Sequence, residues 1–354
     1  MKLTKMKLLA ALIVGASAMP AMAVPLFGVT YAGDFSPTAI NNSGQVVGRV
    51  AGATVLYSGS SLSVLGGSNM VVTGINDAAT VVGYQTSNTG VRQAFIQSNG
   101  TLTNIGAASV DVGDLSINNA GQVAGSFGVA GDQRHAFLYQ DGTLTDLNQG
   151  QAAPFEGSAT AINNQGQIAG TAGEYSWSAT PVIYANGTAT PLANSRPDGY
   201  QIYASGISDN SDVLLNGRYG PSGSIESFVY SKGVLTNIGE FSGLDINGSS
   251  LVVGTNALGG GSAHLWDSGT LYNLNSLIDP ASGWYLQSAV GINDNNQIAA
   301  FGCRTTGALE CGTLILSAQG VSAVPEPTTY AMMLGGLGML GFMARRRRAA
   351  KSTA

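Results

Sequence analysis

One alternation of apolar and polar positions recurs along most of the chain. Its clearest version spans residues 162–170 and reads Ile-Asn-Asn-Gln-Gly-Gln-Ile-Ala-Gly. An Ile ends a β-rich run, an Asn-rich polar stretch follows, and an apolar pair begins the next run. Aligned on the first Ile, seven copies begin at Ile40, Ile75, Ile117, Ile162, Ile207, Ile246 and Ile292. The copies therefore repeat every 35 to 46 residues.

The polar stretch predicts a tight turn between two strands. Asn follows the Ile in six copies, with Ser208 as the exception, and Asn or Asp comes second in six copies. These side chains bond their own backbone in turns, and Gly or Asn tolerates a positive φ. The fourth position after the Ile is Gly in three copies and Asn296 in the last. The β-branched pair after each turn predicts the next strand.

Each repeat also contains the sequence of a second hairpin. Two-residue turn sequences between β-rich runs occur at Asn99-Gly100, Asp141-Gly142, Asn186-Gly187, Lys232-Gly233 and Ser268-Gly269. Asn-Gly or Asp-Gly between such runs is the strongest short-range signal for a hairpin. Each copy thus holds four short strands in about 40–45 residues, the size of one β-propeller blade. A β-helix, the main alternative, has much shorter rungs.

The sequence therefore predicts an all-β fold, a propeller of seven four-stranded blades over residues 24–321. The run from Leu26 to Tyr31 precedes the first turn without a hairpin partner, and the fourth strand of the last copy is weak. We expect the N-terminal strand to pair into the last blade and close the ring, because closure removes exposed sheet edges.

Composition agrees with this class and separates the ends from the body. The chain has 50 Gly and only 10% charged residues, as suits an all-β protein with many turns. Eight of the 15 basic residues but one of the 20 acidic ones lie in the two ends, so the body carries 7 basic and 19 acidic groups, a net charge of −12. An acidic body argues against nucleic acid or anionic lipid as a partner. We expect no cofactor and at most weak calcium binding.

The N-terminus, residues 1–23, has the three regions of a secretory signal peptide. Three lysines precede the apolar run from Leu8 to Val14, and Ala21 and Ala23 provide a small-residue cleavage site. We expect cleavage after Ala23.

The C-terminal segment, residues 322–354, has the features of a second targeting signal. Val324, Pro325, Glu326 and Pro327 interrupt regular structure, and residues 328–344 follow without a charge. Such a helix would span roughly 25 Å, the short end of what crosses a bilayer. The cluster of Arg345, Arg346, Arg347 and Arg348 would hold its end in the cytoplasm as a membrane stop.

This segment resembles the PEP-CTERM sorting signal of Gram-negative bacteria. The resemblance implies processing by an exosortase, an inner-membrane-tethered intermediate, and release to the cell surface or extracellular matrix; a plain membrane anchor is the alternative. The repeat, with His135-Ala136-Phe137 and the copy at Ile117, resembles the HAF repeat of bacterial extracellular proteins. That resemblance covers roughly residues 26–320 and implies an extracellular location without an established chemistry.

Few residues suggest a catalytic, metal-binding or disulfide-forming role. Cys303 and Cys311 lie in an exported chain, where a disulfide that bridges a hairpin is expected over two free thiols. His135 and His264 occupy different positions of the repeat and belong to different blades, which favours structural roles for both. The acidic pairs Asp111/Asp114 and Asp209/Asp212 could hold calcium, but solvated turn residues explain them better. The sequence has no nucleophile elbow, P-loop, dinucleotide fingerprint or zinc spacing.

Two classes of function remain open on these grounds. The first is an exported, exosortase-sorted surface or matrix protein whose propeller is a structural or binding platform for extracellular polysaccharide or other matrix components. The second is a polysaccharide-acting hydrolase or lyase with its site at the propeller channel. The missing catalytic pattern favours the first, so we expect no catalytic residues, resident cofactor or metal site.

Overall fold

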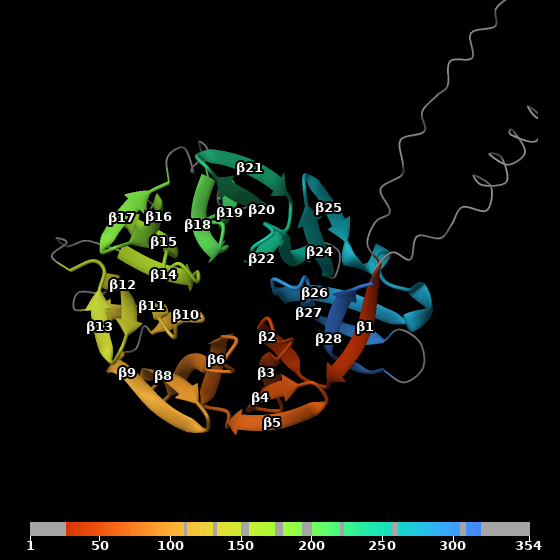
Figure 1. Ribbon diagram of the computed structural model, residues 1–354, viewed down its shortest axis with the longest axis horizontal. Coiled ribbons are helices and arrows are strands. Elements are labelled where there is room, and N and C mark those ends of the chain that lie inside the picture. The colour runs from red at the N-terminus through yellow and green to blue at the C-terminus, as the bar shows by residue number, and fades with distance from the viewer. Residues whose placement is uncertain are drawn as a thin grey trace, which may run out of the picture. The chain divides into compact units, whose positions relative to one another are not determined.

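The fold is an all-β propeller of seven four-stranded blades arranged around a central channel (Figure 1). The computed structural model describes residues 26–109, 112–129, 133–149, 156–173, 180–192, 200–219, 223–256, 261–304 and 309–319. These residues contain strands and two short 3₁₀ helices but no α-helix. The predicted fold class is therefore confirmed.

Each of the first six blades is a run of four consecutive antiparallel strands. Blade 1 contains β2 (Ser36–Ile40), β3 (Val46–Val50), β4 (Ala53–Ser58) and β5 (Ser61–Gly66), and blade 2 contains β6 (Met70–Ile75), β7 (Val81–Thr86), β8 (Arg92–Ser98) and β9 (Thr101–Ser109). Blade 3 contains β10 (Gly113–Ile117), β11 (Val123–Val129), β12 (Gln133–Gln140) and β13 (Thr143–Asp146), and blade 4 contains β14 (Glu156–Ile162), β15 (Ile168–Gly173), β16 (Thr180–Ala185) and β17 (Thr188–Pro191). Blade 5 contains β18 (Tyr200–Ile207), β19 (Val213–Tyr219), β20 (Ile225–Ser231) and β21 (Val234–Gly239), and blade 6 contains β22 (Ser242–Ile246), β23 (Val252–Asn256), β24 (Ser262–Asp267) and β25 (Thr270–Asn273).

The seventh blade is built from both ends of the propeller. It consists of β26 (Trp284–Ile292), β27 (Ile298–Arg304), β28 (Cys311–Ala318) and the N-terminal strand β1 (Phe27–Gly33), in the order β1-β28-β27-β26. β1 pairs antiparallel with β28 from Phe27↔Ala318 onward. The predicted closure by the N-terminal strand is therefore confirmed. The 3₁₀ helices η1 (Leu274–Ser276) and η2 (Pro280–Ser282) link blade 6 to this blade.

The hydrophobic core lies between neighbouring blades. One cluster combines Val82 and Ile105 of blade 2 with Leu115 and Phe137 of blade 3, all 2% exposed or less. Because both faces of each sheet are covered in this way, the strands carry apolar residues on both faces near the channel, as in the Val46-Val47 pair.

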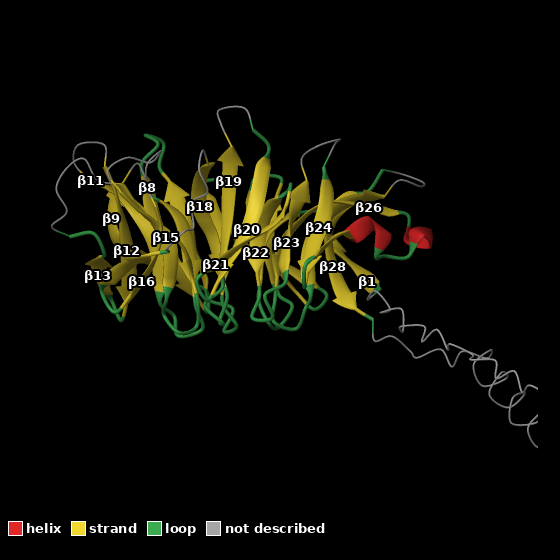
Figure 2. Ribbon diagram, turned by 90° about the horizontal axis from the view of Figure 1, so that it is seen from above, coloured by secondary structure: helices red, strands yellow, loops and turns green. Residues whose placement is uncertain are grey.

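The five two-residue turns form the second hairpins as predicted. Both turn residues have positive φ, for example 49° at Asn99 and 78° at Gly100, and Ser98 pairs directly with Thr101. These are type I′ turns, whose twist matches that of the flanking strands. They lie at the same end of the strands as the Asn-rich turns, along the lower edge of Figure 2.

Several predicted segments lie outside the described residues. They are the signal peptide 1–23 with Ala21 and Ala23, the motif 324–327, the helix 328–344 and the Arg345–Arg348 cluster. Within the residues that the structure describes, no helix is long and apolar enough to cross a membrane.

Candidate functional site at the channel mouth

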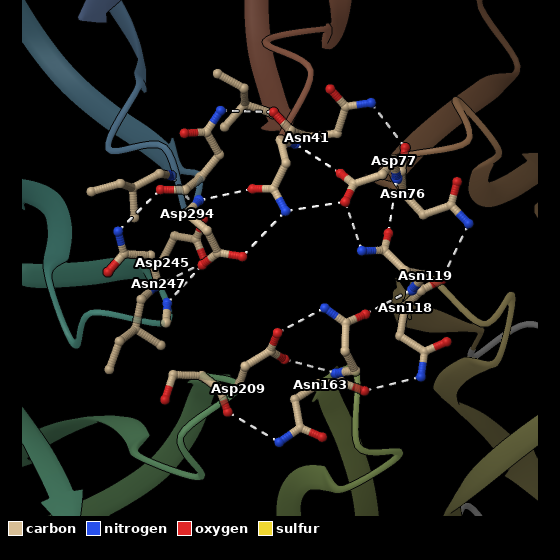
Figure 3. Close-up of a pocket in the computed structure, with 18 of the residues that line it drawn as sticks. Asn41, Asn76, Asp77, Asn118, Asn119, Asn163, Asp209, Asp245, Asn247 and Asp294 are labelled. Atoms are coloured by element: carbon tan, nitrogen blue, oxygen red, sulfur yellow. Dashed lines mark hydrogen bonds between the residues drawn. The ribbon is translucent and has the colours of Figure 1, made fainter. Parts of the chain in front are cut away.

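The seven Asn-rich turns surround one mouth of the central channel. They line a cavity of about 170 Å³. Each blade contributes the Ile that ends its innermost strand and the two residues that follow (Figure 3). The most repetitive segment of the sequence therefore lines the channel mouth in all seven blades.

The Asn directly after the Ile organises its own turn. The Oδ1 of Asn163 accepts hydrogen bonds from the backbone N–H of Gln165 (3.1 Å) and Gln167 (2.9 Å). Its Nδ2 donates to Oε1 of Gln167 (2.8 Å), which explains the Gln four residues further on. The same Oδ1 pattern recurs in the other five copies that have Asn, and Ser208 reproduces it with its Oγ.

The same asparagines also connect the blades. In six copies the Nδ2 donates to the backbone carbonyl of the equivalent residue in the next blade. These bonds are Asn41 to Asn76 (2.9 Å), Asn76 to Asn118 (3.1 Å), Asn118 to Asn163 (3.0 Å), Asn163 to Ser208 (3.0 Å), Asn247 to Asn293 (3.0 Å) and Asn293 to Asn41 (2.8 Å). All six asparagines are buried, so the ring is a structural element rather than a free binding surface.

The second residue of each turn forms a second, more exposed ring, called the outer ring here, and three of its members are carboxylates. Asp77 accepts from the N–H of Asn42 (2.8 Å) and from the Nδ2 of Asn119 (2.7 Å). Asp209 accepts two bonds from Asn164, both 2.8 Å, and Asp294 accepts from the N–H of Gly248 (2.8 Å). Among the described residues that line this mouth there is no Lys, Arg or His. The mouth therefore presents hydrogen-bond acceptors and negative charge.

Both rings are interrupted between blades 5 and 6. Ser208 has no Nδ2 to donate, and Gly248 has no side chain where the other copies have Asn or Asp. Asn210 compensates for the absent Nδ2 of Ser208, because its own Nδ2 donates a hydrogen bond to the carbonyl of Gly248 in the next blade. The gap lies between Asp209 and Asp294, which makes it the most acidic part of the mouth.

Asp245 is a functional candidate that sequence reasoning missed. It directly precedes the aligned Ile246, at a position where the other copies have Ala39, Gly74, Ser116, Ala161, Gly206 and Gly291. The sequence could have indicated it, because Asp245 is a charged residue at a repeat position where all other copies have a small residue. Its Oδ2 accepts the N–H of Ile292 in blade 7 (2.9 Å), and its Oδ1 accepts that of Ile246 (2.9 Å).

The environment of Asp245 alters its acidity. Burial raises the pKa of this carboxyl from 3.8 to about 7, the two backbone N–H groups oppose the rise, and the charge of Asp294 adds to it. Although the residue as a whole keeps some exposed surface, its carboxylate is enclosed by the channel wall, and that enclosure explains the shift. Asp245 is therefore a carboxyl group that can exchange a proton near neutral pH.

The two histidines lie in different blades, away from the channel mouth. His135 in blade 3 is buried, and its Nδ1 lies 2.8 Å from Oδ2 of Asp146. His264 in blade 6 lies opposite Gly254, as Phe95 lies opposite Gly83. The structure does not bring the two together.

The predicted calcium pairs do not converge either. Asp209 belongs to the outer ring, whereas Asp212 contacts the Oγ of Ser250. Asp111 lies outside the described residues. Within the described part of the chain, no three His, Cys, Asp or Glu residues could hold a metal ion, and weak calcium binding stays a prediction.

The expected disulfide between Cys303 and Cys311 is present. The two residues face each other in β27 and β28, with 4.0 Å between their Cα atoms. The bond lies at the end of the blade 7 hairpin, opposite the Asn-rich turns.

Comparison with known proteins supports the C-terminal sorting signal and the fold. The PEP-CTERM protein-sorting motif matches residues 323–348. This motif implies an exported protein that passes through a membrane-anchored intermediate and is processed by an exosortase. No curated protein matches the chain. The comparisons give the HAF-repeat resemblance no support, and it stays an interpretation.

Solved structures similar to the propeller share its fold at low identity. The β-propeller domain of the Trilobed protease from Pyrococcus furiosus, described as having an open velcro topology, has a TM-score of 0.56 and 11% identity, over 80% of this chain and 95% of that one. An oligogalacturonate lyase in complex with manganese has a TM-score of 0.53 and 9% identity, over 84% and 97%. A chain of the mitotic checkpoint complex has a TM-score of 0.51 and 12% identity, over 89% and 99%. At such identities the likeness shows the fold alone.

Proposed function

We propose that the chain is an exosortase-sorted protein of the cell surface or extracellular matrix, whose propeller is a structural or binding platform for matrix components such as polysaccharide. The observation that carries this proposal is the sorting motif at residues 323–348, which follows directly on a closed propeller. In this proposal residues 1–23 direct export, residues 24–321 form the platform, and residues 322–354 are removed or retained as the anchor. The HAF-repeat resemblance would be consistent with the same location.

The channel mouth supports a platform rather than a catalytic centre. The buried asparagine donors are used to join blades, and the carboxylates of the outer ring accept bonds from neighbouring turns. Side chains held in this way stabilise the ring and leave acceptor lone pairs that can receive hydroxyl groups. Such a surface suits a hydroxyl-rich polymer.

The experiment is to express the full chain in a Gram-negative bacterium that has an exosortase, beside a variant with Pro325 and Pro327 replaced by Ala. We expect the wild-type protein in the surface or secreted fraction and the variant in the inner membrane. An identical distribution of both proteins would contradict the proposal. Retention of the exported protein on extracellular polysaccharide, measured by co-sedimentation, tests the platform role.

One observation favours the alternative of a polysaccharide hydrolase or lyase. Asp245 lies in the channel wall with a pKa raised to about 7, as a general acid or base requires. Release of oligosaccharide by the wild-type protein and its loss in Asp245→Asn would support this reading. Retention of the protein on polysaccharide without cleavage of the polysaccharide would support the platform function.

A further inference from the structure

The outer ring of the channel mouth has one gap, at Gly248 in blade 6 (Figure 3). In six of the seven steps around the ring, the backbone N–H of one member donates to the side-chain Oδ1 of the member in the next blade. These bonds run from Asn42 to Asp77 (2.8 Å), Asp77 to Asn119 (2.9 Å), Asn119 to Asn164 (2.9 Å), Asn164 to Asp209 (2.8 Å), Gly248 to Asp294 (2.8 Å) and Asp294 to Asn42 (2.8 Å). The seventh step, from Asp209 to Gly248, lacks an acceptor because glycine has no side chain.

The backbone N–H of Asp209 is consequently a donor without a partner at the gap. Asp209 lies in a turn rather than in a strand ladder, and within the described part of the chain no group accepts a hydrogen bond from its N–H. The equivalent N–H of each other ring member points to the side chain of the next blade, so the repeat directs this one toward the missing side chain of Gly248.

Carboxylates flank the gap on both sides. Asp209 and Asp294 line the mouth beside Gly248. Asp209 accepts two bonds from Asn164, and Asp294 accepts the N–H of Gly248, but each carboxylate oxygen has a second lone pair. The described lining of the mouth contains no cationic side chain that would pair with these charges. The gap therefore combines one hydrogen-bond donor with charged acceptors.

This combination favours a hydroxyl group as the ligand. A hydroxyl oxygen can accept from the N–H of Asp209 while its proton is donated to a carboxylate. An anionic ligand could accept from the N–H, but both aspartates would repel it. An ammonium group would attract the aspartates, but it has no lone pair for the N–H. A neutral sugar, which presents several hydroxyl groups, satisfies both requirements.

We propose that the gap at Gly248 is the subsite where the channel mouth binds one residue of a neutral polysaccharide. One hydroxyl of the sugar accepts from the N–H of Asp209 and donates to the carboxylate of Asp209 or Asp294. The cavity at the mouth, about 170 Å³, has room for one six-membered ring, since a cavity of about 150 Å³ in another protein holds benzene. The choice of a sugar rests on the proposed platform function, whereas the missing acceptor does not.

Completion of the ring tests the proposal. Gly248→Asn would supply an Oδ1 to the N–H of Asp209, and the φ of Gly248 is not positive, so a side chain is compatible with its backbone. The new Cβ would lie 3.0 Å from Oδ1 of Asp294, a contact that a small shift of this carboxylate relieves. We expect a higher Tm, because the ring gains an interblade bond, and about tenfold weaker binding of neutral methyl hexosides. Saturation-transfer NMR on the exported full chain measures the binding.

Two further variants separate the missing acceptor from other effects. Gly248→Ala occupies the gap without an acceptor, so it should weaken hexoside binding without a gain in Tm. It also keeps the test decisive if Gly248→Asn does not fold. Gly67→Asn is the matched control, because Gly67 lies between β5 and β6, does not line the mouth and has no positive φ. Its hexoside affinity should equal that of the wild type.

The outcomes distinguish this subsite from the platform function. Failure of every neutral hexoside to bind the wild-type protein, or wild-type affinity in a folded Gly248 variant, would overturn the subsite. Binding of glucosamine without binding of methyl glucoside would also overturn it, since the carboxylates alone would explain that preference. If the subsite fails while the wild-type chain still sediments with polysaccharide, the platform function stands. Hexoside binding that Gly248→Asn abolishes, without retention on polysaccharide, would support the subsite and contradict the platform.

Discussion

At the scale of the residue, the Asn after each Ile has more hydrogen-bonding roles than a turn requires. Asn163 satisfies two backbone N–H groups of its own turn and one carbonyl of the next blade, and it is 3% exposed. A Ser can perform the first role, as Ser208 does, but not the second. The near-constancy of Asn among the copies therefore follows from contacts between blades.

Replacement of Asn163 by Ala should destabilise the propeller by about 2–4 kcal/mol, because it leaves buried backbone groups without partners. Chemical denaturation of the purified protein measures this. Asn164→Ala is the control one position further on, where the side chain is exposed, and it should cost less than about 1 kcal/mol. Equal losses in both variants would contradict the assigned roles.

Asp245 should make stability depend on pH. Its folded-state pKa, about 7, lies above the unfolded value near 3.8, so the folded state holds this proton more tightly. Its contribution to stability is complete below about pH 4 and is lost as the pH rises through 7. Asp245→Asn stays neutral, and its Tm should exceed that of the wild type at pH 8 but match it near pH 4. A Tm difference that stays constant with pH would show that this carboxyl does not titrate as described.

At the scale of the element, the innermost strands owe their shape to a β-bulge. In β14 the register shifts between Ala159 and Ala161, opposite Gly170 of β15. A Cβ on Gly170 would lie 1.8 Å from the carbonyl oxygen of Ser158. Equivalent contacts occur at Gly48, Gly83 and Gly254. In these four blades the Gly eight residues after the Ile is thus required by the backbone of the neighbouring strand, whereas blades 5 and 7 have Leu215 and Ala300 at this position.

Gly170→Ala should therefore cost about 2–4 kcal/mol, since backbone must move to accept the methyl group. Gly67→Ala is a suitable control, because its nearest contact would be at 3.8 Å and its φ is not positive. The control should change stability by less than about 1 kcal/mol. Thermal unfolding followed by circular dichroism compares the two, and a harmless Gly170→Ala would refute the steric explanation.

At the scale of the whole molecule, the propeller is closed by contacts between its two ends. β1 pairs along β28, and Phe27 N–H donates to the carbonyl of Leu277 (2.8 Å). Tyr31 of β1 stacks on Trp284 of β26 with 5.3 Å between ring centroids, and Arg304 lies 4.8 Å from the same Trp ring. The N-terminal strand is thus held to both the outer and the inner side of blade 7.

Deletion of residues 24–34 should leave the edge of β28 without its partner and abolish the soluble monomer, because an unpaired strand invites aggregation. Size-exclusion chromatography of the exported protein measures this. A deletion that removes residues 349–354, outside the propeller, serves as the control and should leave the monomer peak. A monomeric, folded deletion of 24–34 would refute closure by the N-terminal strand.

The sequence by itself determined the number of blades, the strands within each blade and the two-residue turns. These depend on local periodicity, on the φ preferences of Asn and Gly and on the repetition of one pattern seven times. It also determined the sorting segment, whose apolar run and Arg cluster are contiguous in the chain, and the pairing of Cys303 with Cys311, the sole cysteines.

Tertiary structure alone decided what gathers at the channel and between blades. The bond from Asn293 to Asn41 joins residues 252 positions apart, and Asp245 bonds Ile292 across a blade boundary. Periodicity predicts each sheet, but the contacts between sheets depend on how the closed ring places side chains that are distant in sequence.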